Sequence, residues 1–533
     1  MQNNYEEKLK KVLNFFLPPA IIDLIVVNTE RKAFFMSEQI IREGFSNETY
    51  IRLQSQKIKD RIEEFGGKLY MEFGGKLFDD YHASRVLPGF APDSKLSMLC
   101  SLKDQAEIVI AINASDIENN KYRGDIGIPY DKEVLRLIDS FRSVGLHVGS
   151  VVLTRYTGQH AAIAFEKNLS SLGIKVYHHY PIRNYPSDVS HIVSEDGFGR
   201  NDYIETTRSL VVVTAPGPGS GKMATCLSQL YHEHKRGIRS GYAKFETFPV
   251  WNLPLKHPVN LAYEAATADL SDVNMIDPYH LEAYDQIAVN YNRDIEIFRV
   301  LDAMMSKIFG KCPYKSPTDM GVNMVGNAIY DDEAVCYAAK QEIIRRYYKT
   351  SCARCRGKAE LSEIRKIELL MDEAGIKPED RAPVPAAKAV AERTGLPAAA
   401  IQLPDGHIVT GKTTDLLGAS SAALLNALKY IADIPDEVML ISPEIIEPIM
   451  HLKTEHLGSK NPHMHTDELL LALSICAVSD DYAERAMQAI GELKGSEVHS
   501  TVILAHADDK LFTKLGAYVT CEPQFEDKSL YHK

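Results

Sequence analysis

The stretch VVVTAPGPGSGKMATCLSQL, residues 211–230, has residue types and spacing close to those of a nucleotide-phosphate site. A run of β-branched residues enters a glycine-rich turn, and a lysine follows where a helix begins. Backbone N–H groups at a helix N-terminus attract anions, and the lysine adds a full positive charge. We therefore predict a phosphate-binding loop for ATP or GTP made by Gly217, Gly219, Ser220, Gly221 and Lys222.

The loop departs from the usual G-x-x-x-x-G-K-[ST] pattern at two positions. Pro216 replaces the first glycine, and Met223 replaces the Ser or Thr whose hydroxyl holds Mg²⁺. Thr225 lies on a different face of the helix, so Mg²⁺ needs carboxylates from further along the chain. We name Asp269 and Asp272 as candidates. A turn that only packs the helix against a sheet is the alternative interpretation.

A second lysine follows in RGIRSGYAKFETF, where Lys244 lies near the end of the next strand. This arrangement resembles dethiobiotin-synthetase-like and cytidine-triphosphate-synthase-like ATP-dependent ligases. The resemblance implies that Lys244 meets the phosphoryl group during transfer, where a second cation stabilises the developing charge. The predicted catalytic residues are Lys222, Lys244, Asp269 and Asp272.

Polar loops follow the other apolar strands of the N-terminal half. In an open parallel sheet, ligands bind beyond the carboxyl ends of the strands. NASDIENNKYRGDIGI follows an apolar strand at 107–113, and WNLPLKHPVN follows the strand that carries Lys244. The predicted substrate-binding residues in these loops are Asp116, Arg123, Asn252, His257 and Asn260.

Two further motifs suggest other chemistry. GHIVTGKT, residues 406–413, matches the phosphate-loop pattern without mismatch, but HIVT favours a strand, and LPDG before it is a turn signal. We interpret it as the return strand of a hairpin. Histidines at 451–465 suggest a metal-dependent hydrolase, although neither zinc-protease pattern is present, and we assign no metal ligand.

Composition limits the partners. The net charge is −12 and the pI about 5.9, which disfavours a polyanionic partner. Eight cysteines show no disulfide framework, so we predict a cytoplasmic protein. We expect a small-molecule substrate, no nucleic-acid or membrane partner, and self-association into a homo-oligomer.

Apolar strands alternate with helices up to residue 245, which predicts βαβ units around a buried parallel sheet. The predicted fold is α/β, with a P-loop-like, Rossmann-like domain at 36–330. A helical connector follows at 331–382, and a smaller C-terminal α/β domain at 383–533. Residues 1–35 are interpreted as an extension outside the domain.

Several longer strings resemble one bacterial family. They are FGGKLFDDYHASRVLPGF, LVVVTAPGPGSGKMATCLSQLYHE, SPTDMGVNM and LPDGHIVTGKTTDLLGASSAALLNALK. They are similar to domain of unknown function eighteen-forty-six, from about Met36 to the C-terminus. The resemblance implies N- and C-terminal family domains but no activity, so the functional prediction rests on the residues. That prediction is a nucleotide-dependent enzyme of the kinase or ligase type. The alternatives are a non-catalytic regulatory protein that binds a nucleotide or phosphometabolite, and a metal-dependent hydrolase.

Overall fold

The computed structural model describes residues 42–74, 77–78, 80–123, 127–270 and 272–526. Two compact units divide the chain, one spanning Glu43–Glu342 and the other comprising the chain from Ile343 onward. The predicted extension at 1–35 lies outside the described residues. Helix α15 (Asp332–Cys355) runs from the first unit into the second. The domain boundaries placed at 330 and 382 stay predictions.

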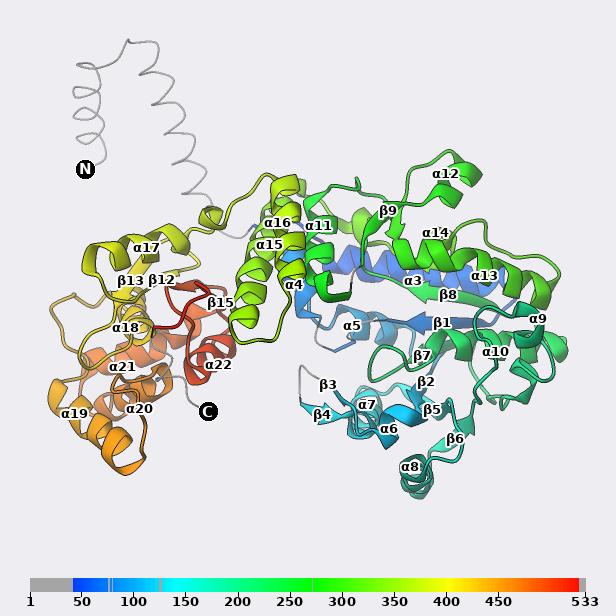
Figure 1. Cartoon of the computed structure of the whole chain (residues 1–533), viewed down its shortest axis with the longest axis horizontal. Helices are drawn as coiled ribbons and strands as arrows, with labels where there is room; N and C mark the ends of the chain where they lie inside the picture. Colours follow the sequence, from blue (N-terminus) through cyan, green and yellow to red (C-terminus); the bar gives the residue numbers. More distant parts are fainter. Residues whose placement is uncertain (1–41, 75–76, 79, 124–126, 271, 527–533) are drawn as a thin grey trace, which may run out of the picture. The chain divides into compact units, whose positions relative to one another are not determined.

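The N-terminal unit is built on a seven-stranded parallel sheet with strand order β11-β8-β1-β7-β2-β5-β6 (Figure 1). Every residue of β2 and β7 is buried, as expected when helices cover both faces of a sheet. The strands are β1 (Leu69–Phe73), β2 (Ala106–Asn113), β5 (His147–Thr154), β6 (Lys175–His178), β7 (Leu210–Thr214), β8 (Gly241–Phe245) and β11 (Gly321–Val322).

The helices of this unit have polar and apolar sides. In α7, apolar residues at three- and four-residue spacing, such as Val134, Leu137, Ile138 and Phe141, are buried. The helices are α3 (Asn47–Glu64), α4 (Tyr81–Val86), α5 (Ser94–Ser101), α6 (Ala114–Glu118), α7 (Tyr130–Ser143), α8 (His160–Ser171), α9 (Val189–Ile192), α10 (Lys222–Lys235), α11 (Pro258–Ala266), α12 (Pro278–Tyr284), α13 (Asn292–Phe309) and α14 (Pro317–Met320). Two short antiparallel pairs complete the unit: β3 (Tyr122–Arg123) with β4 (Ile128–Pro129), and β9 (Asn274–Ile276) with β10 (Val289–Tyr291).

The strand order reverses at the centre of the sheet. From β2 the chain moves outward to β5 and β6, whereas from β7 it moves the opposite way to β8 and β11. Because such crossovers are right-handed, α7 after β2 and α10 after β7 cover opposite faces. Their first turns therefore diverge at the carboxyl ends of two neighbouring strands, which is where open α/β sheets bind ligands.

The C-terminal unit contains a smaller four-stranded sheet with order β13-β12-β14-β15. Its apolar core includes Ile401, Leu424 and Leu473. The strands are β12 (Ala398–Gln402), β13 (Ile408–Lys412), β14 (Glu497–Ser500) and β15 (Tyr518–Cys521). The helices after α15 are α16 (Leu361–Ala374), α17 (Pro383–Thr394), α18 (Ala419–Ile431), α19 (Pro443–His451), α20 (Thr466–Cys476), α21 (Asp481–Gln488) and α22 (His506–Lys514).

The predicted fold class is confirmed: a parallel α/β sheet is followed by helices and by a smaller α/β unit. The GHIVTGKT stretch forms β13 and pairs antiparallel with β12, so its interpretation as a hairpin strand is also confirmed.

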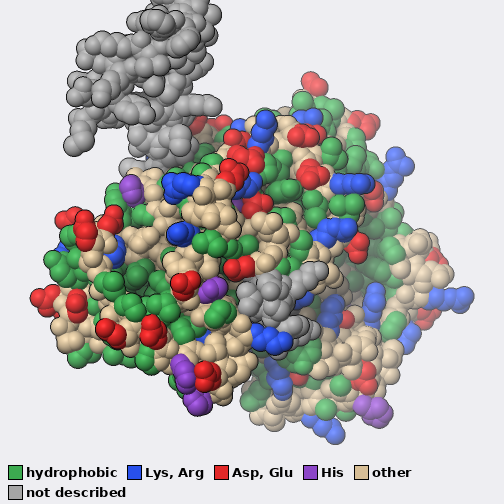
Figure 2. All heavy atoms as spheres, turned by 60° about the vertical axis from the view of Figure 1, so that its left-hand side comes forward, with side chains coloured by type: hydrophobic (Ala, Val, Ile, Leu, Met, Phe, Trp, Pro, Cys, Tyr) green, Lys and Arg blue, Asp and Glu red, His purple; other side chains and the backbone are tan. Residues whose placement is uncertain are grey.

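The described surface gives two further observations. No helix within the described residues is both long and apolar enough to cross a membrane. On the face shown in Figure 2, Lys and Arg side chains are interspersed with Asp and Glu and form no broad basic patch.

Candidate functional site

The loop between β7 and α10 ends with uncapped backbone donors. Gly221 is the N-cap of α10 in the left-handed conformation, φ 87°, and no side chain caps the helix. The first helical hydrogen bond runs from the Thr225 N–H to the Gly221 carbonyl at 2.9 Å. The N–H groups of Lys222, Met223 and Ala224 therefore have no acceptor among the described residues. These donors can hold an anion.

The glycines of this loop serve different purposes. A Cβ atom on Gly217 would overlap the Tyr130 hydroxyl, and one on Gly221 would lie 3.1 Å from Thr154. These two glycines thus allow close packing against neighbouring segments. Gly219 differs, since its φ is 76° and a Cβ there would meet nothing within 4 Å. Its backbone faces open space at the crevice.

Two hydroxyl groups fix the shape of the loop. Ser220 is buried and its Oγ donates to the Gly217 carbonyl at 2.8 Å. Thr154, the last residue of β5, donates from Oγ1 to the Ser220 carbonyl, also at 2.8 Å. Ser220 therefore shapes the loop with its side chain. These two hydrogen bonds stabilise the turn without a ligand.

Lys222 is half-buried at the start of α10. Its ammonium group makes no hydrogen bond or ion pair with any residue that the structure describes. Met223 packs against the apolar core, and Thr225 is fully buried. Neither offers a hydroxyl beside Lys222, so the chain lacks the usual Mg²⁺ ligand at this point.

A second charged group lies at the same edge of the sheet. Lys244 pairs in register with Glu72 of β1, which pairs in turn with Val213 of β7. The Lys244 Nζ lies 3.0 Å from a carboxylate oxygen of Glu246 and also pairs with Asp294, in the first turn of α13. Adjacent strands lie about 4.8 Å apart, which puts the Lys244 backbone roughly 10 Å from β7.

Burial and crowding shift the pKa values in this group. Burial raises the pKa of the Glu246 carboxyl to about 7; Asp294 adds to the rise and Lys244 opposes it. Burial opposes the charge of Lys244, but the carboxylates of Asp294 and Glu246 hold its pKa above the ordinary value. Burial and the nearby Glu72 raise the pKa of Tyr242, whose hydroxyl donates to Glu72 at 2.8 Å. A carboxyl that titrates near neutrality beside a lysine can act as an acid or base.

The other predicted catalytic acids lie elsewhere. Asp269 is exposed and has no hydrogen bond or ion pair with any described residue. Asp272 is buried and pairs with Arg293, whose Nη2 donates to Oδ2 at 2.8 Å and whose Nε lies 2.7 Å from Oδ1. Neither forms an ion pair with Lys222 among the described residues.

Two predicted substrate residues lie in the β2–α7 connection. Asp116 is half-buried in α6 and pairs with Lys121 at 3.3 Å. Arg123 pairs with Glu133, which is fully buried on α7. This connection contacts the phosphate loop through Tyr130, the first residue of α7, so it lies on the same crevice.

Two further substrate candidates, Asn260 and Asn252, contact other parts of the protein chain. Asn260 is fully buried; its Oδ1 accepts from the Val250 N–H, and its Nδ2 donates to the Val250 and Pro254 carbonyls. Asn252 is exposed and lies against Gly326. Neither makes a hydrogen bond to the phosphate loop or to Lys244 within the described residues.

His257 belongs to a separate polar cluster with Asp332 and Cys336, whose ligand atoms lie within 4.8 Å of one another. The Nδ1 atom accepts from the Val259 N–H at 3.2 Å, so the hydrogen sits on Nε2, which faces Asp332 at 3.0 Å. A metal-binding imidazole keeps its hydrogen on the nitrogen away from the metal. If Nε2 bound a metal, the hydrogen would have to be on Nδ1, but Nδ1 accepts from the Val259 N–H. This favours a hydrogen-bonded histidine over a metal ligand.

The histidines at 451–465 do not form a metal site among the described residues. His451 and Glu455 are exposed and pair at 3.1 Å, and no set of three ligand atoms within mutual reach occurs there. His465 instead pairs with Asp508 at 3.1 Å.

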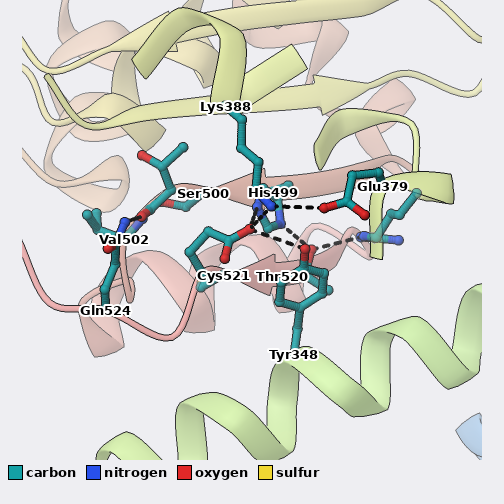
Figure 3. Close-up of polar contacts among 12 residues, drawn as sticks. Tyr348, Glu379, Lys388, His499, Ser500, Val502, Thr520, Cys521 and Gln524 are labelled. Carbon is teal, nitrogen blue, oxygen red and sulfur yellow. Dashed lines mark hydrogen bonds and ion pairs between the residues drawn. The ribbon is translucent and has the colours of Figure 1, made fainter. Parts of the chain in front are cut away.

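A charged cluster in the C-terminal unit is architectural. Arg381 is fully buried, pairs with Glu497, and donates to Thr520 at 2.9 Å. Thr520 also lies 2.9 Å from His499 Nδ1 (Figure 3). Lys388, 2.9 Å from Glu522, completes the group. Each charge has a partner inside the cluster, which joins α17, β14 and β15.

Sequence reasoning missed Glu72, Asp294, Tyr130 and Thr154. Glu72 carried a usable signal, because a carboxylate inside the apolar strand LYMEF is unusual. Asp294 carried none, since acids are common in the first turn of helices.

Two protein-family models together match most of the chain. Residues 43–375 match the model for "Domain of unknown function DUF1846, N-terminal", and residues 379–531 match "Domain of unknown function DUF1846, C-terminal". UPF0371 proteins from Streptococcus pneumoniae strains JJA and CGSP14 are each 59% identical over 492 residues. That alignment covers 92% of this chain and 100% of each relative.

Proposed function

The chain belongs to the DUF1846 family, and we propose that it is an ATP- or GTP-dependent enzyme of the kinase or ligase type. The observation that carries the proposal is the set of N–H groups at the start of α10, beside the Lys222 ammonium, none of which has a partner in the part of the chain that the structure describes. Phosphate oxygens match such donors in charge and in hydrogen-bonding capacity.

The position of the loop supports a phosphate ligand. It lies where the strand order reverses, between helices that leave toward opposite faces. Gly219 presents its backbone to open space, while Ser220 and Thr154 hold the turn. A loop fixed in advance loses little freedom when it binds its ligand.

The second charged group supplies the chemistry in this proposal. Lys244 exchanges its carboxylate partners for a phosphoryl oxygen and stabilises the charge that develops during transfer. Glu246, with a pKa of about 7, accepts a proton from the attacking hydroxyl or amine of a small-molecule substrate. The substrate lies along the β2–α7 connection, near Asp116 and Arg123.

The Asp294 carboxylate beside Lys244 also fits Mg²⁺ better than Asp269 or Asp272. Mg²⁺ in nucleotide sites takes one or two carboxylates, with water and phosphate oxygens completing the shell. Asp294 contacts the Lys244 ammonium group and offers such oxygens at the carboxyl edge of the sheet, while Glu246 keeps the role of base. Bound Mg²⁺ would neutralise phosphate charge in place of a loop hydroxyl.

Equilibrium binding of ATP and GTP to the full chain, with and without Mg²⁺, tests the proposal. We expect Lys222→Ala to weaken nucleotide binding by roughly tenfold or more, since it removes a charge-assisted contact. Lys235→Ala is the matched control, because Lys235 lies at the other end of α10 and pairs with Glu195. Equal affinity in the Lys222→Ala and wild-type proteins would reject the site.

Met223 favours a second candidate, a regulatory protein that binds a nucleotide or phosphometabolite without turnover. Its side chain packs into the core and cannot bind Mg²⁺. Nucleotide binding that is independent of Mg²⁺ and gives no product would support this candidate over the enzyme.

A further inference from the structure

A cavity of about 40 Å³ lies in the C-terminal unit, between the first turns of α18 and α22. It is lined by Ser420 on α18, Asp508 on α22, His463 and His465 before α20, and Ser500 at the end of β14. We propose that this cavity binds an oxyanionic group, a carboxylate or phosphoryl group, of a small metabolite. The site is separate from the proposed nucleotide site and does not depend on it.

Both helices present uncapped backbone donors to the cavity. α18 has Gly418 at its N-cap and α22 has Ala505, and no side chain caps either helix. The first helical hydrogen bonds come from the Ala422 N–H to Gly418 and from the Asp509 N–H to Ala505. The N–H groups of the preceding turn in each helix thus have no helical acceptor. Gly418 and Ala505 both line the cavity.

Ser420 is the observation that points to a ligand. Its side chain is 4% exposed, and it lines the cavity. Its hydroxyl has no hydrogen-bond partner among the described residues. Its neighbour Ser421 is also buried, but the Ser421 hydroxyl donates to the Met464 carbonyl at 2.8 Å. A hydroxyl that has no protein partner and lines a small cavity needs water or a ligand in that cavity as its hydrogen-bond partner.

Two carboxylates line the cavity, Asp508 and Glu526, and the charge of Asp508 is met by hydrogen bonds from its neighbours. Asp508 accepts from the Thr466 N–H and hydroxyl, both at 2.8 Å, and from His465 Nδ1 at 3.1 Å. Burial opposes the charge of Asp508, but these bonds hold its pKa below the ordinary value. Its charge is therefore directed toward His465 and Thr466. Glu526 lies exposed at the rim.

The size of the cavity suits one small group. A water molecule needs about 10–15 Å³ of such volume, so 40 Å³ holds the volume of roughly three waters. A carboxylate or a phosphoryl group fits this space, with the rest of the metabolite extending toward the rim. An entire nucleotide does not fit.

Binding of inorganic phosphate and of acetate to the full-length Lys222→Ala protein tests the inference, since this variant lacks the lysine of the proposed nucleotide site. We expect one saturable site for at least one of the two anions. Ser420→Val, whose methyl groups enter the cavity, should weaken that binding by roughly tenfold or more, and Ser420→Ala by several-fold. Ser421→Ala is the control and should leave the affinity unchanged.

The two anions distinguish the sources, because preference for phosphate indicates a phosphorylated metabolite and preference for acetate a carboxylic acid. If Ser420→Val does not fold, Ser420→Ala and selenate-soaked crystals give the answer, with a selenium peak expected in the cavity and a selenate oxygen within hydrogen-bond distance of the Ser420 hydroxyl. Absence of saturable binding by either anion, or binding that Ser420 substitutions leave unchanged, would overturn the inference. Loss of nucleotide binding in Lys222→Ala would leave it intact.

Discussion

Lys244 and Glu246 form an ion pair across 3.0 Å at the carboxyl end of β8, with Asp294 contacting the same ammonium group. Two carboxyl groups thus share one lysine in a largely buried setting. Burial, with a further contribution from Asp294, raises the pKa of the Glu246 carboxyl to about 7, although Lys244 opposes the rise. This arrangement combines a cation and a titratable base within the proposed phosphoryl-transfer region.

The raised pKa of Glu246 predicts a stability that falls with pH. Because the folded pKa lies above the ordinary value, the folded state binds more protons between about pH 4.5 and pH 7. Unfolding free energy should decline across that window by up to about 1.4 kcal/mol per pH unit from this group. Glu246→Gln should flatten the decline. Urea unfolding of the wild-type and Glu246→Gln proteins from pH 5 to 8 measures the decline in unfolding free energy. Identical slopes against pH would contradict the raised pKa of Glu246.

Gly217→Ala should destabilise the protein because the added methyl group would overlap the Tyr130 hydroxyl. We expect a loss of about 1–3 kcal/mol in unfolding free energy. Tyr130→Phe in the same chain should recover part of that loss by removing the hydroxyl. Unfolding followed by circular dichroism measures both, and a neutral Gly217→Ala would show that the loop is looser than the structure indicates.

Asn260→Ala tests whether this residue positions substrate or backbone. Its side chain makes three hydrogen bonds to the Val250 and Pro254 backbone while fully buried. The substitution should cost about 2–4 kcal/mol, since buried backbone groups lose their partners. The exposed Asn252→Ala serves as the control, with a change within about 0.5 kcal/mol. A stable Asn260→Ala protein that loses substrate binding would restore the substrate assignment.

Arg381→Met should strongly destabilise the C-terminal unit. Arg381 is fully buried and paired with Glu497, and removing one partner of a buried pair typically costs about 3–5 kcal/mol. Lys388→Met, at a partly exposed position of the same cluster, should cost less than about 1 kcal/mol. Chemical unfolding of the Arg381→Met and Lys388→Met proteins measures the two losses of unfolding free energy. Equal losses of unfolding free energy in the two variants would mean that burial does not determine how much each ion pair stabilises the unit.

The sequence predicted the large sheet well because its strands are strongly apolar and bounded by glycine-rich turns. The β7–α10 junction follows from that pattern, since β-branched residues end at a turn with three glycines. The sequence could also exclude the perfect GHIVTGKT match, because residue types inside it favour β13.

The charged group around Lys244 could be predicted only in part. Its members come from β1, the end of β8 and α13, and their meeting depends on strand order. Strand order decides which loops are neighbours, and local patterns do not encode it. The choice of Asp269 and Asp272 rested on proximity in sequence alone, and the chain instead commits Asp272 to Arg293.

Hydrogen exchange of the amides in residues 215–226, with and without ATP and Mg²⁺, measures whether the first turn of α10 binds phosphate. The N–H groups of Lys222, Met223 and Ala224 have no partner among the described residues, so they should exchange rapidly in the free protein. Bound phosphate should slow their exchange by roughly tenfold or more, and Lys222→Ala should abolish that protection. Unchanged exchange in this segment at saturating ATP would contradict the account.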